Sequence, residues 1–558
     1  LQSSPGNQLK SSPLPPLQPF TAGLLLSPDP SPSQAFSFCK HKSALQLTGK
    51  MYTIRLLLCV SYFFHEAIGV KPSCNSDIYC KGELLHTVQM AKLFPDSKTF
   101  VDKKMRFPPK QVLENFNNTF YPFKENGKKA PKELIRKFVD SNFEDGKELM
   151  EWSPSDWSPH PMVLNNIADL NLRKWASELN GIWKNLSRKV VEDVIDHQDM
   201  YSLMYVPNGF IIPGGRFKEL YYWDTYWIVN GLLICDMVKT ARGVIENLLY
   251  LVSKLGHVPN GSRVYYTERA QPPMLTLMVE AYFKHTGDFS FIRKNIELLD
   301  KEMDFWLDNR LINIEKDGVT YSLFRYFAPS TGPRPESYRE DYETAANETN
   351  DDDRFMKYVA LKSSAESGWD FSTRWFIKNG SNDGNLSNIM TQNIIPVDLN
   401  ALLHKNFILL SNWHTMLENK AKAMRYYRLS NMVLRGIEGV LWSNDEGIWL
   451  DYDILNEKPR PYFYMSNFVP LWTKSHTLRP AKLTKYVMNY IEKFNIMSYP
   501  GGTPTSVQYS GEQWDFPNAW PPLQAFFIQG LDRIGSPLAS EAAYMFAHRY
   551  LLSNYKGF

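Results

Sequence analysis

Apolar residues in this chain recur at three- and four-residue spacing along most of its length beyond about residue 160. Such spacing predicts a helix with one buried face. In residues 162–186 the stripe consists of Leu164, Ala168, Leu172, Trp175, Leu179 and Ile182. Similar stripes occupy 234–256, 272–287, 291–309, 397–419 and 421–442. No Val- and Ile-rich alternation is long enough to build a main sheet. The sequence therefore predicts an all-α fold, a closed ring of antiparallel helices with long irregular loops gathered at one mouth.

The N-terminal segment has a different composition. Residues 1–50 contain no Met and are rich in Ser and Pro, a composition that buries too little apolar surface to fold. We expect 1–50 to be an unstructured leader outside the natural protein. Met51 then opens MYTIRLLLCVSYFF, whose apolar run is too short to span a bilayer and is typical of a cleaved secretory signal over 51–69. Residues 70–558 are expected to form one domain of a secreted protein.

Cysteine and sequon usage agree with secretion. Cys74 and Cys80 bracket CNSDIYC just after the expected cleavage point, and we expect a secreted chain to close this loop as a disulfide. Six Asn-x-Ser/Thr sequons follow the signal and suggest a glycoprotein; they begin at Asn117, Asn185, Asn260, Asn347, Asn379 and Asn385. No Cys/His cluster has metal-ligand spacing, so no metal is predicted. The net charge of +3 gives no indication of nucleic acid.

Four irregular stretches hold most of the candidate chemistry. The first, residues 213–227 (PGGRFKELYYWDTYW), follows two glycines, which allow close backbone approach, with Arg216, a rigid fork of donors. Trp223 beside Asp224 offers an apolar face and an acceptor for hydroxyls. The alternative is a glycine turn leading into an aromatic-rich helix, with Arg216 and Glu219 in a salt bridge.

The second and third stretches carry further polar groups. HVPNGSRVYYTERAQPP contains Asn260, Arg269 and Gln271, and it is also compatible with an ordinary polar turn. FAPSTGPRPESYRED places Arg334 and Glu336 on either side of a proline. This acid–base pair could grip hydroxyl groups, or it could be an exposed loop salt bridge.

The fourth stretch, AESGWDFSTRWF at 365–376, places Asp370 between an indole and a phenyl ring. A carboxyl in such surroundings is costly to ionise, so its pKa should rise, as a general acid at neutral pH requires. Glu366, four residues earlier, is expected to raise that pKa further. The alternative is that Asp370 caps a helix or pairs with Arg374.

A later stretch, YPGGTPTSVQYSGEQWDFPNAWPPLQ at 499–524, repeats this style, with Trp514, Asp515 and Trp520 among prolines and glycines. Five stretches that combine aromatic rings with Arg, acids or amides in one helical chain favour a cleft that binds a polyol.

These stretches resemble the motifs of the trehalase family. PGGRFKELYYWDTY matches the first trehalase signature, PGGRFxExYxWDxY, at every fixed position, and QWDFPNAWPP at 513–522 matches the second, QWDxPxxWxP. RAQPP, RPESY and ESGWDFSTRW are similar to other motif blocks, as is IIPVDLNALL. The resemblance covers about residues 74–558, and CNSDIYCKGELLHTVQ is similar to the start of insect secreted trehalases.

The resemblance implies an (α/α)6 toroid of glycoside hydrolase family 37, which hydrolyses α,α-trehalose to two glucoses with inversion and without a cofactor. It makes Asp370 the general acid. The implied sugar-binding residues are Arg216, Trp223, Asp224, Asn260, Arg269, Ala270, Gln271, Arg334, Pro335, Glu336, Gly368, Trp514 and Trp520. Because a glycan on Asn260 would fill the cleft, the expected glycosylation sites are Asn117, Asn185, Asn347, Asn379 and Asn385.

One departure from the family pattern concerns the second carboxylate. An inverting glycosidase needs a general base about 6.5–9.5 Å from the acid. In the family this base is the Glu of a Gly-rich GGGGEY-type motif near the C-terminus, which this sequence lacks. We therefore expect an incomplete chain whose base lies beyond Phe558, and a membrane anchor beyond that point is left open. The alternatives are a natural truncated isoform, a protein that binds trehalose without hydrolysing it, or a helical scaffold with remnant motifs.

Overall fold

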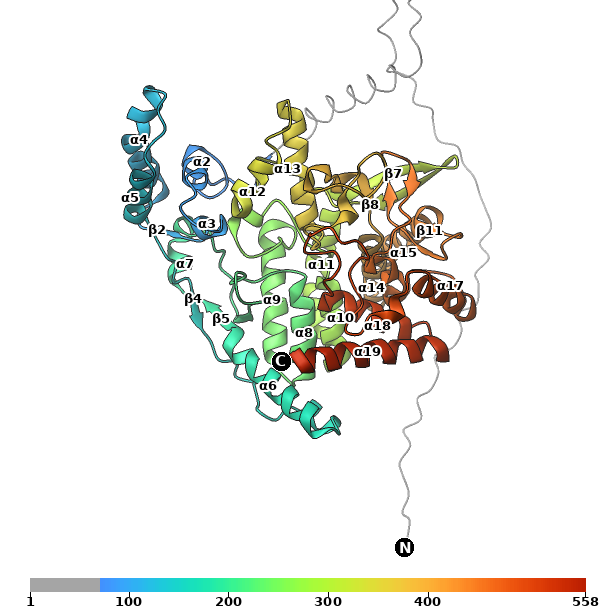
Figure 1. Ribbon diagram of the computed structural model, residues 1–558. Helices are drawn as coiled ribbons and strands as arrows, with labels where there is room; N and C mark the ends of the chain where they lie inside the picture. The colour runs from blue at the N-terminus through green and yellow to red at the C-terminus, as the bar shows by residue number, and fades with distance from the viewer. Residues whose placement is uncertain (1–70, 558) are drawn as a thin grey trace, which may run out of the picture. The chain divides into compact units, whose positions relative to one another are not determined.

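The computed structural model describes residues 71–557, which are predominantly helical (Figure 1). The expected leader at 1–50 and signal peptide at 51–69 lie outside the described residues. Within them, Cys74 and Cys80 form the predicted disulfide, with Cα atoms 5.5 Å apart.

Five helices that are rich in buried residues pack in series along the chain, α8 on α10, α10 on α14, α14 on α16 and α16 on α18. They form an inner layer because apolar side chains occupy most of their circumference, as in α14, where Leu402, Phe407 and Leu410 are all buried. Their bounds are α8 (Asp224–Ile234), α10 (Leu275–Thr286), α14 (Val397–Met416), α16 (Val469–Thr473) and α18 (Pro521–Asp532).

Six further helices alternate with the inner helices along the chain, and five of them have one buried and one exposed face. In α6 only Asn180 is buried and Ile182 is exposed, so the buried face predicted for the stripe at 162–186 is wrong. Among them, α9 packs on α8 and α10, α15 packs on α14, and α19 packs on α18. This alternation of outer and inner helices is the arrangement of an α/α toroid, as predicted. The bounds are α6 (Leu170–Leu186), α9 (Val238–Leu255), α11 (Phe289–Arg310), α15 (Lys420–Gly436), α17 (Pro480–Lys493) and α19 (Pro537–Gly557).

All six predicted apolar stripes are helical. The stripe at 162–186 is interrupted, because the Asp169 side chain accepts hydrogen bonds from the N–H groups of Asn171 and Leu172 and so caps α6 at Leu170. A separate 3-10 turn, Met162–Asn166, precedes it. Among residues 71–557, every helix falls short of the length and apolarity needed to cross a membrane.

The remaining helices lie outside this alternation. Several of them share a second hydrophobic core, whose buried residues include Phe116, Phe120 and Phe138 as well as Tyr221 and Tyr266 from the candidate site stretches. The N-terminal segment is thereby attached to the loops of the toroid. The bounds are α2 (Glu83–Met90), α3 (Lys98–Val101), α4 (Pro109–Glu125), α5 (Lys132–Asn142), α7 (Asp193–Asp196), α12 (Tyr338–Thr344) and α13 (Asp351–Glu366).

Strands in the described residues form only sheets of two or three strands. The longest is the hairpin of β7 and β8, which the sequence analysis did not predict although Asp317-Gly318 between alternating residues favours such a turn. The pairs are β1 (Lys71–Pro72) with β9 (Ser330–Thr331), β2 (Lys104–Met105) with β3 (Phe143–Glu144), β7 (Leu311–Lys316) with β8 (Val319–Phe324), and β11 (Trp442–Ser443) with β12 (Ile448–Trp449). The triplets are β4 (Leu149–Glu151), β5 (Ser187–Val190), β6 (Phe210–Ile211) and β10 (Ile394–Ile395), β13 (Tyr452–Asp453), β14 (Lys458–Pro459).

Candidate active site

The first and second stretches meet at the start of α8. Gly214 and Gly215 both have positive φ, 102° and 59°, so the chain turns sharply there before α8 begins at Asp224. The buried Trp223 precedes Asp224, and its main-chain N–H donates to Oε1 of Gln271 at 3.0 Å. The predicted residues Trp223, Asp224 and Gln271 therefore lie together.

Asn260 and Ala270 connect the second stretch to the fourth. The Asn260 side chain donates to the carbonyls of Ala270 (3.3 Å) and Ala365 (3.1 Å). The Ala270 N–H donates to Oε1 of Glu366 at 3.0 Å. Asn260 is buried, with 5% of its surface exposed, and the absence of a glycan from its sequon stays a prediction.

The third stretch is buried, and its ion pairs differ from the predicted one. Arg334 pairs with Asp341 through Nη2 and Oδ1 at 2.6 Å, and Glu336 pairs with Arg269. The expectation of a pair between Arg334 and Glu336 is wrong, because each side chain pairs with a different residue. The alternative of an exposed loop salt bridge is also wrong, because both side chains are buried. Pro335 between them is also buried.

Asp370 follows α13 and is half-buried. Burial raises the pKa of its carboxyl, and the positive charges of Arg334 and Arg269 do not outweigh that effect. The direction agrees with the prediction, but the carboxylate that helps to raise this pKa is Glu336. Glu366 is instead occupied by Arg310, with contacts of 2.6 and 2.9 Å.

The alternative pairing of Asp370 with Arg374 is wrong. The Arg374 guanidinium is fully buried and is bound by Asp398 at 2.8 Å and Asp451 at 2.7 Å. The Asp370 main-chain carbonyl accepts a hydrogen bond from Oγ of Ser364.

Asp224 is a second carboxyl close to Asp370. Burial and the negative charge of Asp370 raise the pKa of Asp224 to about 6. Two neighbouring carboxyls that share a poorly hydrated site titrate as a pair, and one of them holds its proton towards neutral pH. This is the electrostatic arrangement that acid–base chemistry at a glycosidic bond requires.

Indole rings form one side of the site. Trp514 stacks on Trp520, with ring centroids 4.4 Å apart, and on Trp369 at 5.7 Å, and its centroid is 5.8 Å from that of Trp223. The main-chain N–H of Trp514 donates to the carbonyl of Phe371 at 3.1 Å. The late stretch is thereby joined to the fourth, and Trp223, Trp369 and Trp514 are buried in this cluster of rings.

At Gly368 the main chain of the fourth stretch comes close to the indole of Trp223. The φ of Gly368 is 75°, and a Cβ placed there would lie 2.8 Å from that indole. Only glycine combines this backbone conformation with the required space. Asp515 has a structural role, since it is fully buried and accepts hydrogen bonds from Ser372 and Ser506.

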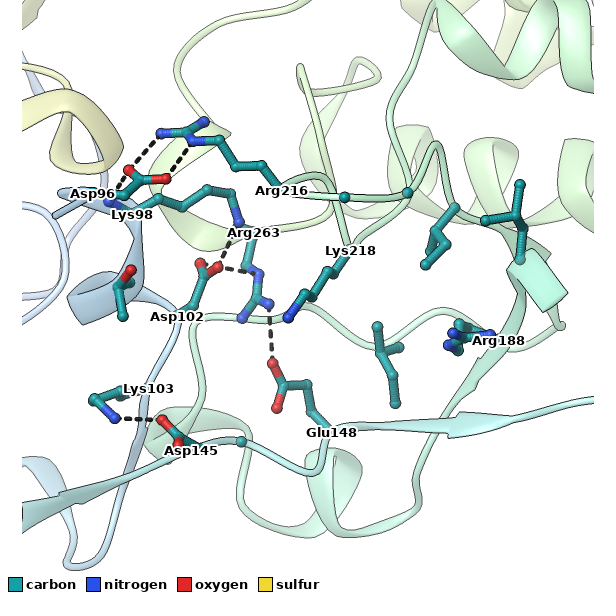
Figure 2. Close-up of a pocket in the computed structure, with 17 residues that line it drawn as sticks. Asp96, Lys98, Asp102, Lys103, Asp145, Glu148, Arg188, Arg216, Lys218 and Arg263 are labelled. Atoms are coloured by element: carbon teal, nitrogen blue, oxygen red, sulfur yellow. Dashed lines mark hydrogen bonds and ion pairs between the residues drawn. The ribbon is translucent and has the colours of Figure 1, made fainter. Parts of the chain in front are cut away.

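Arg216 lies at the border of the site. The alternative of a pair with Glu219 is wrong, because the guanidinium contacts Asp96 and donates to the carbonyl of Glu336 at 3.0 Å. Arg216 also lines a cavity of about 670 Å³ together with Asp96, Lys98 and Lys218 (Figure 2). The sequence analysis missed Asp96 and Asp341, because no local motif marks either residue as the partner of a site arginine.

A half-buried carboxyl of raised pKa, a second carboxyl beside it, buried arginines and stacked indoles lie in the loops of an α/α toroid. This fold and site define the class of the protein as a glycosidase. The family model described as trehalase matches residues 92–558, and the chain belongs to the trehalase family.

Individual relatives give the same result. The chain is 49% identical over 512 residues to trehalase from Apis mellifera, covering 91% of this chain and 80% of that one. It is 42% identical over 510 residues to trehalase from Homo sapiens, covering 91% of this chain and 86% of that one. Among solved structures, neutral trehalase Nth1 from Saccharomyces cerevisiae matches with a TM-score of 0.54 at 23% identity. That match covers 63% of this chain and 67% of the yeast chain, and it supports the fold.

Proposed function

We propose that this protein hydrolyses α,α-trehalose to two glucose molecules with inversion, using Asp370 as the general acid. The observation that carries the proposal is the position of Asp370. Burial raises the pKa of its carboxyl, although the positive charges of Arg334, Arg269 and Arg216 favour the ionised form. A protonated carboxyl at that point can donate its proton to the glycosidic oxygen as the bond to the anomeric carbon breaks.

The neighbouring residues bind the two glucose units. Oε2 of Glu336 is buried without a hydrogen-bond partner among the described residues, and so is Nε of Arg269. Such atoms are costly to leave unpaired and are ready to exchange hydrogen bonds with sugar hydroxyls. Asp224 supplies a further acceptor, and Trp223 and Trp514 provide apolar faces. The other assigned residues that line the sugar are Arg216, Asn260, Ala270, Gln271, Arg334, Pro335, Gly368 and Trp520.

Inversion requires a second carboxylate that removes a proton from the attacking water. The proposal assigns that role to none of the residues named above. In this proposal Asp224 accepts hydrogen bonds from sugar hydroxyls, since it lies in the first signature, whose residues bind the glucose ring.

The stereochemistry of the products tests the proposal. Trehalose has two α-anomeric carbons, and inversion at one of them gives one β-glucose and one α-glucose per turnover. Proton NMR in the first minutes of reaction should therefore show the two anomers in equal amounts. A product that is initially all α-glucose would contradict inversion, and binding of trehalose without glucose release would support the non-catalytic alternative.

We further propose that the protein is a secreted glycoprotein. The five remaining sequon asparagines, Asn117, Asn185, Asn347, Asn379 and Asn385, are all exposed, and the disulfide suits an oxidising compartment. Peptide mapping after enzymatic deglycosylation should find modified asparagine at these positions and unmodified Asn260. Glycan on Asn260, or on none of the five, would contradict this assignment.

A further inference from the structure

A short N-terminal segment reaches both of the loops that carry the site arginines. We define residues 89–102, from the end of α2 to the end of α3, as the strap. Gln89 is buried, and its Nε2 donates to the carbonyl of Pro335 at 3.1 Å and to that of Ser97 at 2.8 Å. The strap is therefore hydrogen-bonded to the main chain between Arg334 and Glu336.

Further contacts hold the strap on the same loop. Oγ of Ser97 donates to Glu340 at 2.9 Å. The Arg339 guanidinium donates to the carbonyls of Phe94 (2.9 Å) and Pro95 (2.7 Å). Because both partners contribute main-chain groups, the strap and the loop have a fixed relative position.

Asp96, in the middle of the strap, contacts the other loop. Its carboxylate accepts two hydrogen bonds from Arg216, from Nε at 2.5 Å and from Nη2 at 2.9 Å (Figure 2). Oδ1 of Asp96 also accepts the N–H of Lys98 at 2.9 Å, which fixes the carboxylate itself. Since Nη2 of Arg216 also donates to the carbonyl of Glu336, this guanidinium joins the strap and both site loops.

Buried charges beneath Asp96 anchor this junction. Nζ of Lys98 lies 2.8 Å from Glu219, and both side chains are buried. Glu219 also lies 3.4 Å from Arg263, and Figure 2 shows Arg263 beside Asp102 and Glu148. The fixed acid of the first signature, Glu219, is thus bound to the strap, and it holds the chain three residues after Arg216.

We propose that Asp96 is a positioning residue that orients Arg216 for sugar binding. The inference rests on the proposed function in one respect, that trehalose is the ligand. Asp96 occupies Nε and one side of Nη2, which leaves Nη1 of Arg216 without a hydrogen bond among the described residues and free to donate to a hydroxyl. A guanidinium already held in place loses less side-chain freedom when the sugar binds, and that loss otherwise weakens affinity.

The substitution Asp96→Asn tests this role. It keeps the size of the side chain and its acceptor oxygen, but it removes the charge and one of the two acceptors for Arg216. We expect the Kd for trehalose, measured by calorimetry in an Asp370→Asn background of the full chain, to rise by about 3- to 10-fold. When Asp96→Asn is made in the protein that retains Asp370, KM should rise by a similar factor with a smaller change in kcat. Asp145→Asn is the matched control, because Asp145 lines the same cavity and pairs with Lys103 instead.

A double-substitution cycle separates positioning from general structural damage. In an Arg216→Gln background, Asp96→Asn should change the Kd by less than 2-fold. Asp96→Ser, which can still accept the N–H of Lys98, replaces Asp96→Asn if the latter lowers the melting temperature. An unchanged Kd in the single variant, or the same loss with and without Arg216, would overturn the proposal. Glucose release by the wild type tests the proposed function separately, since the ratio of Kd values does not depend on turnover.

Discussion

Arg269 and Glu336 form a buried ion pair, with Nη2 of the arginine 2.5 Å from Oε1 of the carboxylate. The pair uses only part of each group, because Nε of Arg269 and Oε2 of Glu336 have no hydrogen-bond partner among the described residues. Although burial opposes ionisation, the charges of Arg269 and Arg334 keep the pKa of Glu336 below its usual value. Glu336 is therefore a charged acceptor at the pH values at which Asp370 is to donate its proton.

Removing the charge of Glu336 should weaken recognition of the sugar. Hydrogen bonds to charged groups contribute about 1.5–3 kcal/mol, so Glu336→Gln is expected to lower kcat/KM for trehalose by roughly 10- to 100-fold. The control is Glu343→Gln, which removes an exposed ion pair with Lys92 in the same region. Steady-state kinetics measure kcat/KM for trehalose in both variants. A wild-type kcat/KM for Glu336→Gln would refute the role given to this residue.

A methyl group at Gly368 should disturb the site through Trp223. Gly368→Ala forces an L-residue into φ of 75° and places its Cβ 2.8 Å from the indole. Because displacements of about 1 Å can cost on the order of 100-fold in rate, we expect kcat/KM to fall by at least about 10-fold. Gly287→Ala is matched in φ, 71°, but has nothing within 4 Å, so it should lose some stability and retain activity. Equal kinetics in the two variants would contradict the contact.

The activity should depend on pH through Asp224 and Asp370. When ionised, Asp224 accepts hydrogen bonds from sugar hydroxyls, and its pKa is raised to about 6. The value of kcat/KM should therefore decline as the pH falls through about 6. The charge of Asp370 contributes to that raised pKa. In Asp370→Asn the pKa of Asp224 should therefore be lower, and trehalose affinity measured by calorimetry should be lost only at more acidic pH. An acid limb at the same pH in both proteins would show that the two carboxyls do not interact.

The buried Arg374 cluster should matter for stability. Asp451 contacts Arg374 and accepts the N–H of Val397 at 2.9 Å. Asp451→Asn removes the charged acceptor of two Arg374 hydrogen bonds, while Asp398 still pairs with the guanidinium. The substitution is therefore expected to cost about 1.5–3 kcal/mol of unfolding free energy. Urea denaturation measures this loss, with the exposed Asp445→Asn as the control, which should change stability by less than about 0.5 kcal/mol. Comparable midpoints for the two variants would contradict the proposed anchor.

Periodicity and motifs could predict the helices and the composition of the site. The stripes at 234–256 and 397–419 became α9 and α14 because each buries a continuous apolar face, and that property is local in sequence. The turn at Asp317-Gly318 was also locally visible, but the strands that it joins are short and mixed in composition. The search for longer alternation therefore missed the hairpin.

The ion pairs could not be predicted in the same way. Arg216 meets Asp96 across 120 positions, and Arg374 meets Asp451 across 77, so their proximity depends on the completed fold. By sequence distance alone, the nearer acids Glu219 and Glu336 are suitable partners for Arg216 and Arg334. In the structure Glu219 pairs with the buried Lys98, and Glu336 pairs with the buried Arg269.

Glucose release from trehalose by the Asp370→Asn protein tests the central claim most directly. The substitution keeps the shape of the side chain and removes the proton that the leaving glucose requires. Because general-acid catalysis contributes about 100- to 10,000-fold, kcat should fall by at least 100-fold, while the melting temperature stays equal or rises and trehalose still binds. An Asp370→Asn protein that releases glucose at the wild-type rate would contradict the assignment of Asp370 as the acid and the account built on it.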